Sequence, residues 1–374
     1  MENKAKLVVS AINFFEGGPL SVLKDCLRFL NKSNHAVRFQ IFALVHRKDL
    51  FDHQEFGNII FVEFPKSRES YFYRLYYEYF YFKNFSRKNN VIFWLSLHDI
   101  TPRLNGIQQA VYCHNPSPFR EVKVRNFMKN PTEFLFNLFY KYLYRINIKS
   151  NKYIIVQQQW IRDRFSSMFS LDKNRIVVAT PDINEKGDID LVRHSKIQCD
   201  KKTFIYPTLS RTFKNIEVIG EAVKYINGIG DFDFKIYITI DGSENRYAES
   251  IVEKYKQYKQ LAFIGKIDRM MVYDYYSQVS ALLFPSTLET WGMPITEFKR
   301  FKKPIIVSDL PYAKETVNDY DKAIFFDPMD FKSLAHILIK IIEGRGISYY
   351  PTKKLMYEEP HAENWKSLFD LLLN

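Results

Sequence analysis

The sequence has no long apolar run and few cysteines. Among its 374 residues, no stretch approaches the roughly 20 consecutive apolar residues that a membrane-spanning helix needs. The opening stretch, MENKAKLVVSAINFF, interrupts its apolar run with Ser10 and Asn13, which argues against a secretory signal. The only cysteines, Cys26, Cys113 and Cys199, are too widely spaced for a metal site or a disulfide framework. These absences predict a cytoplasmic protein.

Acidic residues are scarce in the first half of the chain. Residues 1–180 carry 27 Lys and Arg against 14 Asp and Glu, whereas residues 181–374 carry 27 against 28. The net charge of +12 therefore arises in the first half. A basic half attracts phosphate groups of a nucleic acid, an anionic lipid or a phosphorylated substrate. Since no nucleic-acid-binding motif is present, we predict that nucleic acid is not the partner.

Apolar residues make up 46% of the chain, and they fall into short runs that alternate with helical patterns. The apolar run 6–15 is followed by a glycine turn and then by 19–31, where leucines recur at helical spacing. Such alternation predicts parallel sheets covered by helices on both faces. The predicted strands are 6–15, 37–45, 58–65, 90–99, 106–115 and 152–160, then 202–210, 233–242, 260–267, 281–286, 303–309 and 321–328. The other predicted helices are 215–227, 246–258, 269–280, 294–303, 332–344 and 363–373.

The pattern restarts after residue 201, which predicts two α/β domains. Residues 181–201 are polar and without periodicity, so we interpret them as a linker. The predicted N-terminal domain is 1–180 and the predicted C-terminal domain is 202–360. Each is a Rossmann-like, doubly wound parallel sheet, and the two are expected to face a central cleft. Ligands bind such sheets beyond the carboxyl ends of the strands.

Two glutamates stand eight positions apart in PSTLETWGMPITEFKRFKKPIIVSD, residues 285–309. Glu289 follows a predicted strand, and Glu297 is expected in the first turn of a helix that starts near Pro294. A helix N-terminus suits a diphosphate, and carboxylates accept hydrogen bonds from hydroxyl groups. The arrangement therefore fits a nucleotide sugar. The alternatives are that Glu297 merely stabilises the first helical turn and that Glu289 is a solvated loop charge.

The segment from FPS through ETWGMPITE to KPIIVSD resembles the retaining GT-B glycosyltransferases of family 4, the glycosyl transferases group 1. The resemblance covers nearly the whole chain and is to the type that builds bacterial surface polysaccharides. It implies that Glu289 contacts the donor sugar, that Glu297 binds the nucleotide ribose and that the C-terminal helix, 361–374, packs on the first domain. The resemblance also implies that backbone amides surround the donor sugar, those of Thr290, Trp291, Gly292 and Met293.

Two further segments of the second domain carry the resemblance. In YPTLSRTFKN, Arg211 and Lys214 match the basic pair that grips the donor diphosphate. A guanidinium and an ammonium are suited to that task. In FIGKID, Lys266 and Ile267 match the loop that holds the base, although an ordinary strand end explains this segment nearly as well.

In the first domain, FEGGPLS resembles the family's glycine loop, which places Gly17 and Gly18 near the donor phosphate. YCHNPSP puts His114 at a strand end, where the family has a histidine directed at the donor sugar. A lone histidine is more often structural than catalytic. The chain has a second histidine at the preceding strand end, which strengthens the prediction, and we favour His114 as the catalytic one.

The strand end before His114 carries LSLHDITP. Because neighbouring parallel strands end at one edge of a sheet, we predict that His98, Asp99 and Asn115 line an acceptor cleft. Two Asp-x-Asp pairs, Asp188 with Asp190 and Asp231 with Asp233, fall in the predicted linker and ahead of a strand. Neither stands where a metal-binding pair should, so we predict that no metal and no other cofactor is required.

Residues 71–88 and 134–152 combine many aromatic residues with Lys and Arg. Each stretch fits a helix on a membrane surface, where it could hold a lipid-linked acceptor. Each fits a core helix equally well, and the sequence leaves both interpretations open.

Together these features predict a metal-independent, retaining hexosyl- or related glycosyltransferase. Its donor would be a UDP- or GDP-linked sugar, and its acceptor a glycan or lipid-linked oligosaccharide of capsule or O-antigen synthesis. It would lie peripherally on the anionic inner face of the plasma membrane. The alternatives are a sugar-nucleotide epimerase or hydrolase on the same fold and a non-catalytic nucleotide- or glycan-binding protein.

Overall fold

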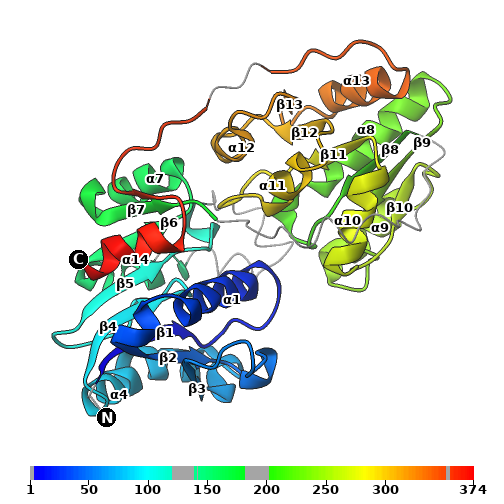
Figure 1. Cartoon of the computed structure of the whole chain (residues 1–374). Coiled ribbons are helices and arrows are strands. Elements are labelled where there is room, and N and C mark those ends of the chain that lie inside the picture. The colour runs from blue at the N-terminus through cyan, green and yellow to red at the C-terminus, as the bar shows by residue number, and fades with distance from the viewer. Residues whose placement is uncertain (1–3, 120–138, 141, 182–201, 351–353) are drawn as a thin grey trace. The chain divides into compact units, whose positions relative to one another are not determined.

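A computed structural model describes residues 4–119, 139–140, 142–181, 202–350 and 354–374. The chain divides into two compact units, 1–182 with 357–374 and 183–356 (Figure 1). Apart from Pro181, the predicted linker 181–201 lies outside the described residues, as do 134–138 of the second aromatic stretch. Both units are α/β structures built on parallel sheets, which confirms the predicted fold class.

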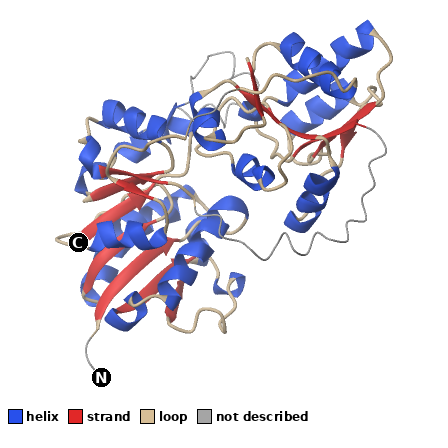
Figure 2. Ribbon diagram, turned by 45° about the horizontal axis from the view of Figure 1, so that its top comes forward, coloured by secondary structure: helices blue, strands red, loops and turns tan. Residues whose placement is uncertain are grey.

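The first unit contains a parallel sheet, whose strands are red among the blue helices of Figure 2. Its eight strands are paired in the order β14-β7-β6-β5-β4-β1-β2-β3. Six of these strands were predicted, and β7 and β14 were not. β14 comes from the C-terminal end of the chain and pairs with β7. The strands are β1 Ala5–Ala11, β2 Phe39–Val45, β3 Ile59–Glu63, β4 Val91–Ser96, β5 Gln108–Tyr112, β6 Tyr153–Val156, β7 Ile176–Ala179 and β14 His361–Ala362.

Apolar runs form these strands because both faces of the sheet are covered. In β1, Leu7 and Val9 face a cluster that includes the buried side of α1, whereas Val8 faces the opposite cluster with Phe82 and Trp94. The last helix, α14, packs into the same cluster as α1. Among the described residues, the helices of this unit include α1 Gly17–Lys32, α2 His35–Arg38, α3 Tyr71–Tyr76, a π-helical turn Tyr77–Tyr81, α4 Phe82–Lys88, α7 Gln159–Phe169 and α14 Trp365–Leu373.

The second unit contains a six-stranded parallel sheet in the order β10-β9-β8-β11-β12-β13. Its strands are β8 Lys202–Tyr206, β9 Phe234–Ile238, β10 Leu261–Phe263, β11 Ala281–Phe284, β12 Ile305–Ser308 and β13 Ala323–Phe326. Its helices are α8 Ile216–Ile229, α9 Arg246–Tyr255, α10 Arg269–Gln278, α11 Met293–Lys299, α12 Pro311–Val317 and α13 Phe331–Ile342. The strand order reverses between β8 and β11, and such a switch point is where open α/β sheets bind ligands.

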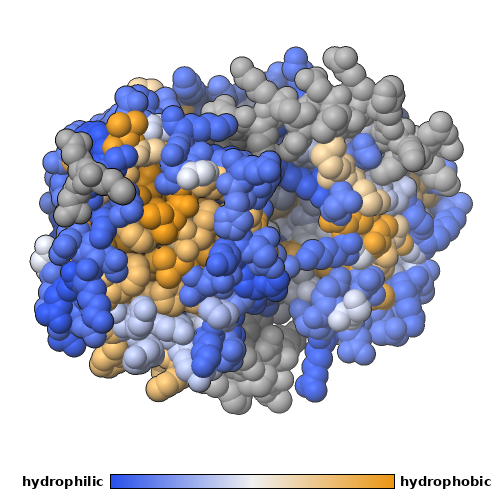
Figure 3. Space-filling model, turned by 60° about the horizontal axis from the view of Figure 1, so that its bottom comes forward, coloured by the Kyte–Doolittle hydropathy of each residue, from blue (hydrophilic) through white to orange (hydrophobic). Residues whose placement is uncertain are grey.

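The surface is mixed in polarity. On the face drawn in Figure 3, hydrophobic residues gather in patches that hydrophilic residues border. Within the part of the chain that the structure describes, none of the helices has both the length and the apolar character needed to cross a membrane.

Candidate active site

The loops that follow β8 and β11 are joined at the switch point of the second unit. The loop after β8 ends in a single 3-10 turn, Thr212–Lys214. Within it, the carbonyl of Phe213 accepts hydrogen bonds from the amide of Thr287 at 2.7 Å, the hydroxyl of Thr287 at 3.0 Å and the hydroxyl of Ser286 at 3.2 Å. Two loops that are more than 70 residues apart in sequence are thereby held in one arrangement.

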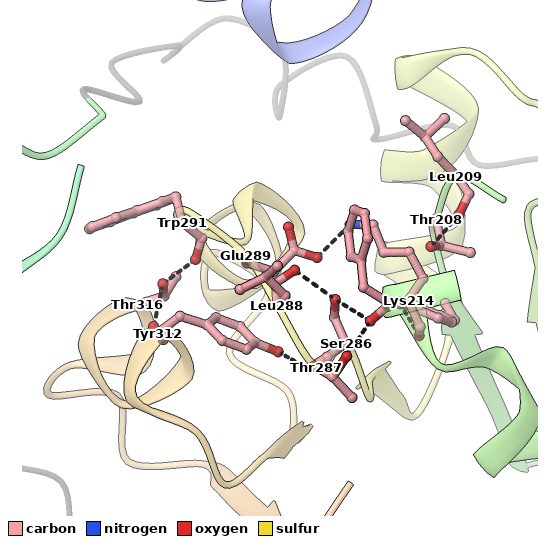
Figure 4. Close-up of polar contacts among 12 residues, drawn as sticks. Thr208, Leu209, Lys214, Ser286, Thr287, Leu288, Glu289, Trp291, Tyr312 and Thr316 are labelled. Carbon is pink, nitrogen blue, oxygen red and sulfur yellow. Dashed lines mark hydrogen bonds and ion pairs between the residues drawn. The ribbon is translucent and has the colours of Figure 1, made fainter. Parts of the chain in front are cut away.

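This arrangement brings two predicted site residues together. The Nζ of Lys214 lies 2.5 Å from Oε1 of Glu289, and both side chains are mostly buried (Figure 4). The hydroxyl of Tyr206 donates to the carbonyl of Lys214 at 2.8 Å, which fixes the backbone from which the lysine extends. Arg211, the other predicted basic residue, stands just before the 3-10 turn and is exposed.

The short loop between the two glutamates is fixed by its own contacts. Gly292 has a left-handed backbone, with φ of 89°, and a Cβ there would lie 3.2 Å from Ile295 and 3.4 Å from Phe284. Trp291 is buried, and its indole N–H donates to the hydroxyl of Thr296 at 2.9 Å. Trp291 therefore belongs to the packed frame of the loop, which leaves the backbone as the part that can surround a ligand. Thr290 and Met293, on either side, are half-buried.

Glu297 stands one residue further into its helix than the sequence predicted. Because α11 begins at Met293, Glu297 directly follows the first turn, in which no acidic residue stands. Its carboxylate lies 3.3 Å from Nη2 of Arg269, the first residue of α10. Arg269 follows Lys266 and Ile267 closely, so it brings their loop beside Glu297, and sequence reasoning missed it.

In the first unit, the structure buries two of the three residues that were expected to line an acceptor cleft, His98 and Asp99, and leaves Asn115 half-buried. His98 is fully buried, with Nδ1 3.0 Å from the carbonyl of Ser10 and Nε2 2.5 Å from Oε1 of Glu78. Asp99 is 8% exposed, and its carboxylate is occupied by donors from within the protein. Neither side chain presents an open face to an acceptor, because partners from distant helices enclose both.

The carboxylate of Asp99 collects four hydrogen bonds. Oδ1 accepts from the amides of His114 at 2.6 Å and Asn115 at 3.1 Å and from the hydroxyl of Tyr144 at 2.7 Å, and Oδ2 accepts from the hydroxyl of Tyr140 at 3.1 Å. The two tyrosines come from the second aromatic stretch. Their spacing of four residues, one helical turn, was the signal that could have indicated a shared partner.

His114 is half-buried at the carboxyl end of β5. Its ring stacks on Tyr112, with centroids 4.2 Å apart and planes 8° apart, and meets the ring of Phe14 edge-on at 5.8 Å. Burial lowers the pKa of His114 to about 4, against the opposing effect of the Asp99 charge. The imidazole is therefore neutral at pH 7. Gly17, which opens α1, has φ of 67° and needs glycine for that reason, whereas Gly18 does not.

Comparison with known proteins shows what the chain is similar to. Residues 190–357, most of the second unit, match the family described as Glycosyl transferases group 1. The chain is 20% identical over 237 residues to the O-antigen chain mannosyltransferase RfbU of Salmonella typhimurium, a match that spans 63% of this chain and 61% of that protein's length.

Several solved structures share the fold of this chain. A glycosyltransferase from Rickettsia africae superposes with a TM-score of 0.66 at 14% identity, covering 91% of this chain and 89% of that one. WaaG, a glycosyltransferase involved in lipopolysaccharide biosynthesis, gives 0.64 at 12% identity with 90% of both chains covered. Anabaena Alr3699/HepE in complex with UDP and glucose gives 0.61 at 13% identity, covering 91% and 90%. At these identities the likeness shows the fold, which is GT-B.

One buried cysteine and the two Asp-x-Asp pairs remain to be described. Cys113 is buried at the end of β5, and burial raises the pKa of its thiol, in keeping with a core residue. Asp188 and Asp190 lie outside the described residues, and Asp231 precedes β9 on the surface. Among the described residues, no group of three or more His, Cys, Asp or Glu is placed to hold a metal ion.

Proposed function

We propose that the protein transfers a sugar from a UDP- or GDP-linked donor to a glycan acceptor with retention of configuration. The observation that carries the proposal is a pair of carboxylates beside the switch point. Each forms an ion pair with a basic side chain from a neighbouring segment of the unit. Lys214 pairs with Glu289, and Arg269 pairs with Glu297. Opposite charges alternating over one loop suit a ligand in which phosphates alternate with hydroxyl-rich groups.

Each group then has a chemical task. The ammonium of Lys214 has three donors, so it can hold Glu289 and a phosphate oxygen together. Lys214 and the exposed Arg211 stabilise the negative charge that grows on the leaving diphosphate. Glu289 accepts hydrogen bonds from the donor sugar, and Glu297 accepts them from the ribose. The neutral ring of His114 can accept a hydrogen bond from the sugar.

Retention follows from attack on the same face. The acceptor oxygen forms a bond to the anomeric carbon while the bond from that carbon to the diphosphate oxygen breaks, and the acceptor proton passes to the departing phosphate. No separate nucleophile or metal takes part in this step. A covalent glycosyl-enzyme adduct trapped by mass spectrometry would contradict it.

Donor binding is the first experiment. We expect UDP or GDP, and not dTDP, to bind with a micromolar dissociation constant in calorimetric titration. Glu297→Ala and Arg211→Ala should each weaken binding by about tenfold or more, because a hydrogen bond to a charged group contributes about 1.5–3 kcal/mol. Glu253→Ala, at an exposed surface ion pair, is the matched control and should bind as wild type does. Equal affinity in all variants would place the donor elsewhere.

We also propose that the acceptor is lipid-linked and that the protein meets it at the cytoplasmic face of an anionic membrane. The stretch 71–88 has two sides. Its inner side buries Arg74, Glu78 and Phe82, whereas its outer side exposes Phe72 by 74% and Phe80 by 63%. The exposed aromatic residues Tyr71, Phe72, Tyr76, Phe80 and Tyr81 form an outer aromatic face. Aromatic side chains beside Lys and Arg favour the interface of an anionic bilayer.

Vesicle sedimentation tests this surface. We expect wild-type protein to bind vesicles that contain phosphatidylglycerol and to bind pure phosphatidylcholine vesicles poorly. A Phe72→Ser, Phe80→Ser double variant should bind the anionic vesicles at least about 100-fold more weakly, since each inserted phenylalanine contributes about 1.5–3 kcal/mol when fully buried and every 1.4 kcal/mol is about tenfold in affinity. The control replaces Tyr349 and Tyr350, exposed aromatics of the second unit, with serine. Equal sedimentation of both variants would remove the outer aromatic face from membrane binding.

A further inference from the structure

The loop that carries His114 is anchored by a buried charge. We propose that Asp99 is a positioning residue whose carboxylate fixes the backbone of His114 and Asn115 and thereby sets the place of the His114 ring during transfer. The inference rests on the proposed function, because it assigns Asp99 an effect on that reaction. Asp99 would act through His114 and would not touch the substrate itself.

The hydrogen bonds to Asp99 support this role. Two successive backbone amides, those of His114 and Asn115, point at one carboxylate oxygen from 2.6 and 3.1 Å. Consecutive amides that converge on one anion define the backbone of a loop closely. The hydroxyls of Tyr140 and Tyr144 complete the set at 3.1 and 2.7 Å. Burial raises the pKa of both tyrosines, so each keeps its proton and remains a donor.

The backbone of Asp99 is itself constrained. Its φ of 72° is left-handed, a conformation that is unfavourable for a residue with a side chain. Its amide donates to the carbonyl of Tyr112, the last residue of β5, at 3.2 Å. Conformations of this kind persist only where the surroundings determine them strongly, and they concentrate at functional sites.

The surroundings that hold Asp99 come from three segments of the chain. The guanidinium of Arg74 donates to the carbonyl of His98 at 2.9 Å, so α3 fixes the residue next to Asp99. Glu78, in the π-helical turn, and Ser10, in β1, hold the His98 ring from opposite sides. A π-helical turn is rare and often marks a functional site. Here it directs Glu78 inward while Phe80 in the same turn stays exposed.

If Asp99 served only to hold the ends of β4 and β5 together, it would not need a negative charge. Burying a carboxylate carries a desolvation penalty of several kcal/mol, which the hydrogen bonds only offset. A neutral amide or hydroxyl could join the same two strands without that penalty. The full negative charge orients both amides more strongly than a neutral acceptor does, because charge-assisted hydrogen bonds are about twice as strong. The geometry of the His114 loop is therefore the feature that the charge maintains.

The test uses the full chain with Asp99→Asn and Tyr144→Phe, and Tyr142→Phe as the control. Tyr142 lies in the same stretch as Tyr144 and is mainly exposed. Hydrogen exchange followed by mass spectrometry is measured on the peptide that contains His114 and Asn115. Steady-state kinetics are measured with the sugar nucleotide that the titration identifies. We expect both test variants to exchange these amides at least tenfold faster and to lose about 10- to 100-fold in kcat, with the donor KM within about threefold of wild type.

The outcomes separate this inference from the proposed function. If wild type turns over no sugar nucleotide, the proposed function fails and the role of Asp99 in it fails too, whatever the exchange shows. If wild type is active and the variants keep their kcat, Asp99 is structural and the inference is overturned, even where exchange is faster. A fall in kcat without faster exchange at His114 and Asn115 also overturns it. If Asp99→Asn does not fold, Tyr144→Phe decides, because it keeps the carboxylate and removes one donor.

Discussion

Replacing Lys214 with methionine is expected to lower kcat by about 100- to 1,000-fold, the loss found when one preorganised donor to a developing charge is removed. Methionine keeps much of the length of lysine but has no charge and no N–H group. In the proposed reaction, the diphosphate leaving group gains negative charge in the transition state. The loss should therefore appear mainly in kcat, with a smaller change in the affinity for the intact donor.

The expected loss depends on the local structure around Lys214. Its ammonium is only 15% exposed and stands 2.5 Å from Glu289, so water competes little for it. The same position lies against the rings of Phe213 and Phe284, with Nζ 5.5 and 5.6 Å from their centroids. Charge interactions in such partly dry surroundings are stronger than at the surface. Lys254→Met is the matched control, because Lys254 pairs with Glu221 at 2.7 Å on the exposed side of α9.

A second variant separates the chemical effect from a loss of stability. Lys214→Met leaves the mostly buried carboxylate of Glu289 without its cation, which destabilises the fold. Adding Glu289→Gln removes that charge and should restore part of the thermal stability. Activity should stay low in the double variant, because neither the ammonium nor the carboxylate returns. Recovery of kcat together with stability would show that Lys214 only supports the fold.

Lowering the pH from 6.5 to 4 is expected to reduce the free energy of unfolding by about 2–3 kcal/mol through His114 alone. Burial lowers the pKa of His114 to about 4, whereas in the unfolded chain it takes its ordinary value of 6.5. Between these values the unfolded chain binds a proton that the folded chain does not. Stability is thus highest above pH 6.5, falls as the pH drops through the window and changes no further from this group below pH 4.

Urea unfolding at several pH values measures the effect. His114→Gln should be clearly less sensitive to pH across the window, since glutamine does not titrate. His35, His46 and His361 also have lowered pKa values and contribute in the same direction, so wild type and variant must be compared directly. His53→Gln, at an exposed position, is the control. An unchanged pH dependence in His114→Gln would show that its ring is not buried in the neutral form.

Much of the fold could be predicted from the sequence. Twelve strands were predicted, and each corresponds to a strand of the structure because buried parallel strands are continuous apolar runs. The strands that were missed, β7 and β14, are short. β14 has only two residues, and they form a strand because they pair with β7 at the edge of the sheet. A pairing across some 180 residues leaves no local periodicity to detect.

Most residues of the candidate site could be predicted from the sequence, but most of their contacts could not. Glu289, Glu297, Arg211 and Lys214 were indicated by their chemistry and spacing. That Lys214 reaches Glu289 depends on β8 and β11 being neighbours in the sheet, which the order along the chain does not reveal. Arg269 was missed for a similar reason, since its partner Glu297 lies on the next helix of the unit.

The sequence by itself determined the α/β class, the two-part pattern of strands and helices and the residue types that a nucleotide sugar needs. Only the tertiary structure decided that His98 and Asp99 are buried, with Glu78, Tyr140 and Tyr144 as their partners. The physical reason is one of range. The spacing of apolar residues that produces a helix or strand involves residues close together in the sequence, so it can be seen in the sequence. The hydrogen-bond partners of a buried charge come from segments far apart in the sequence, so they depend on how those segments pack.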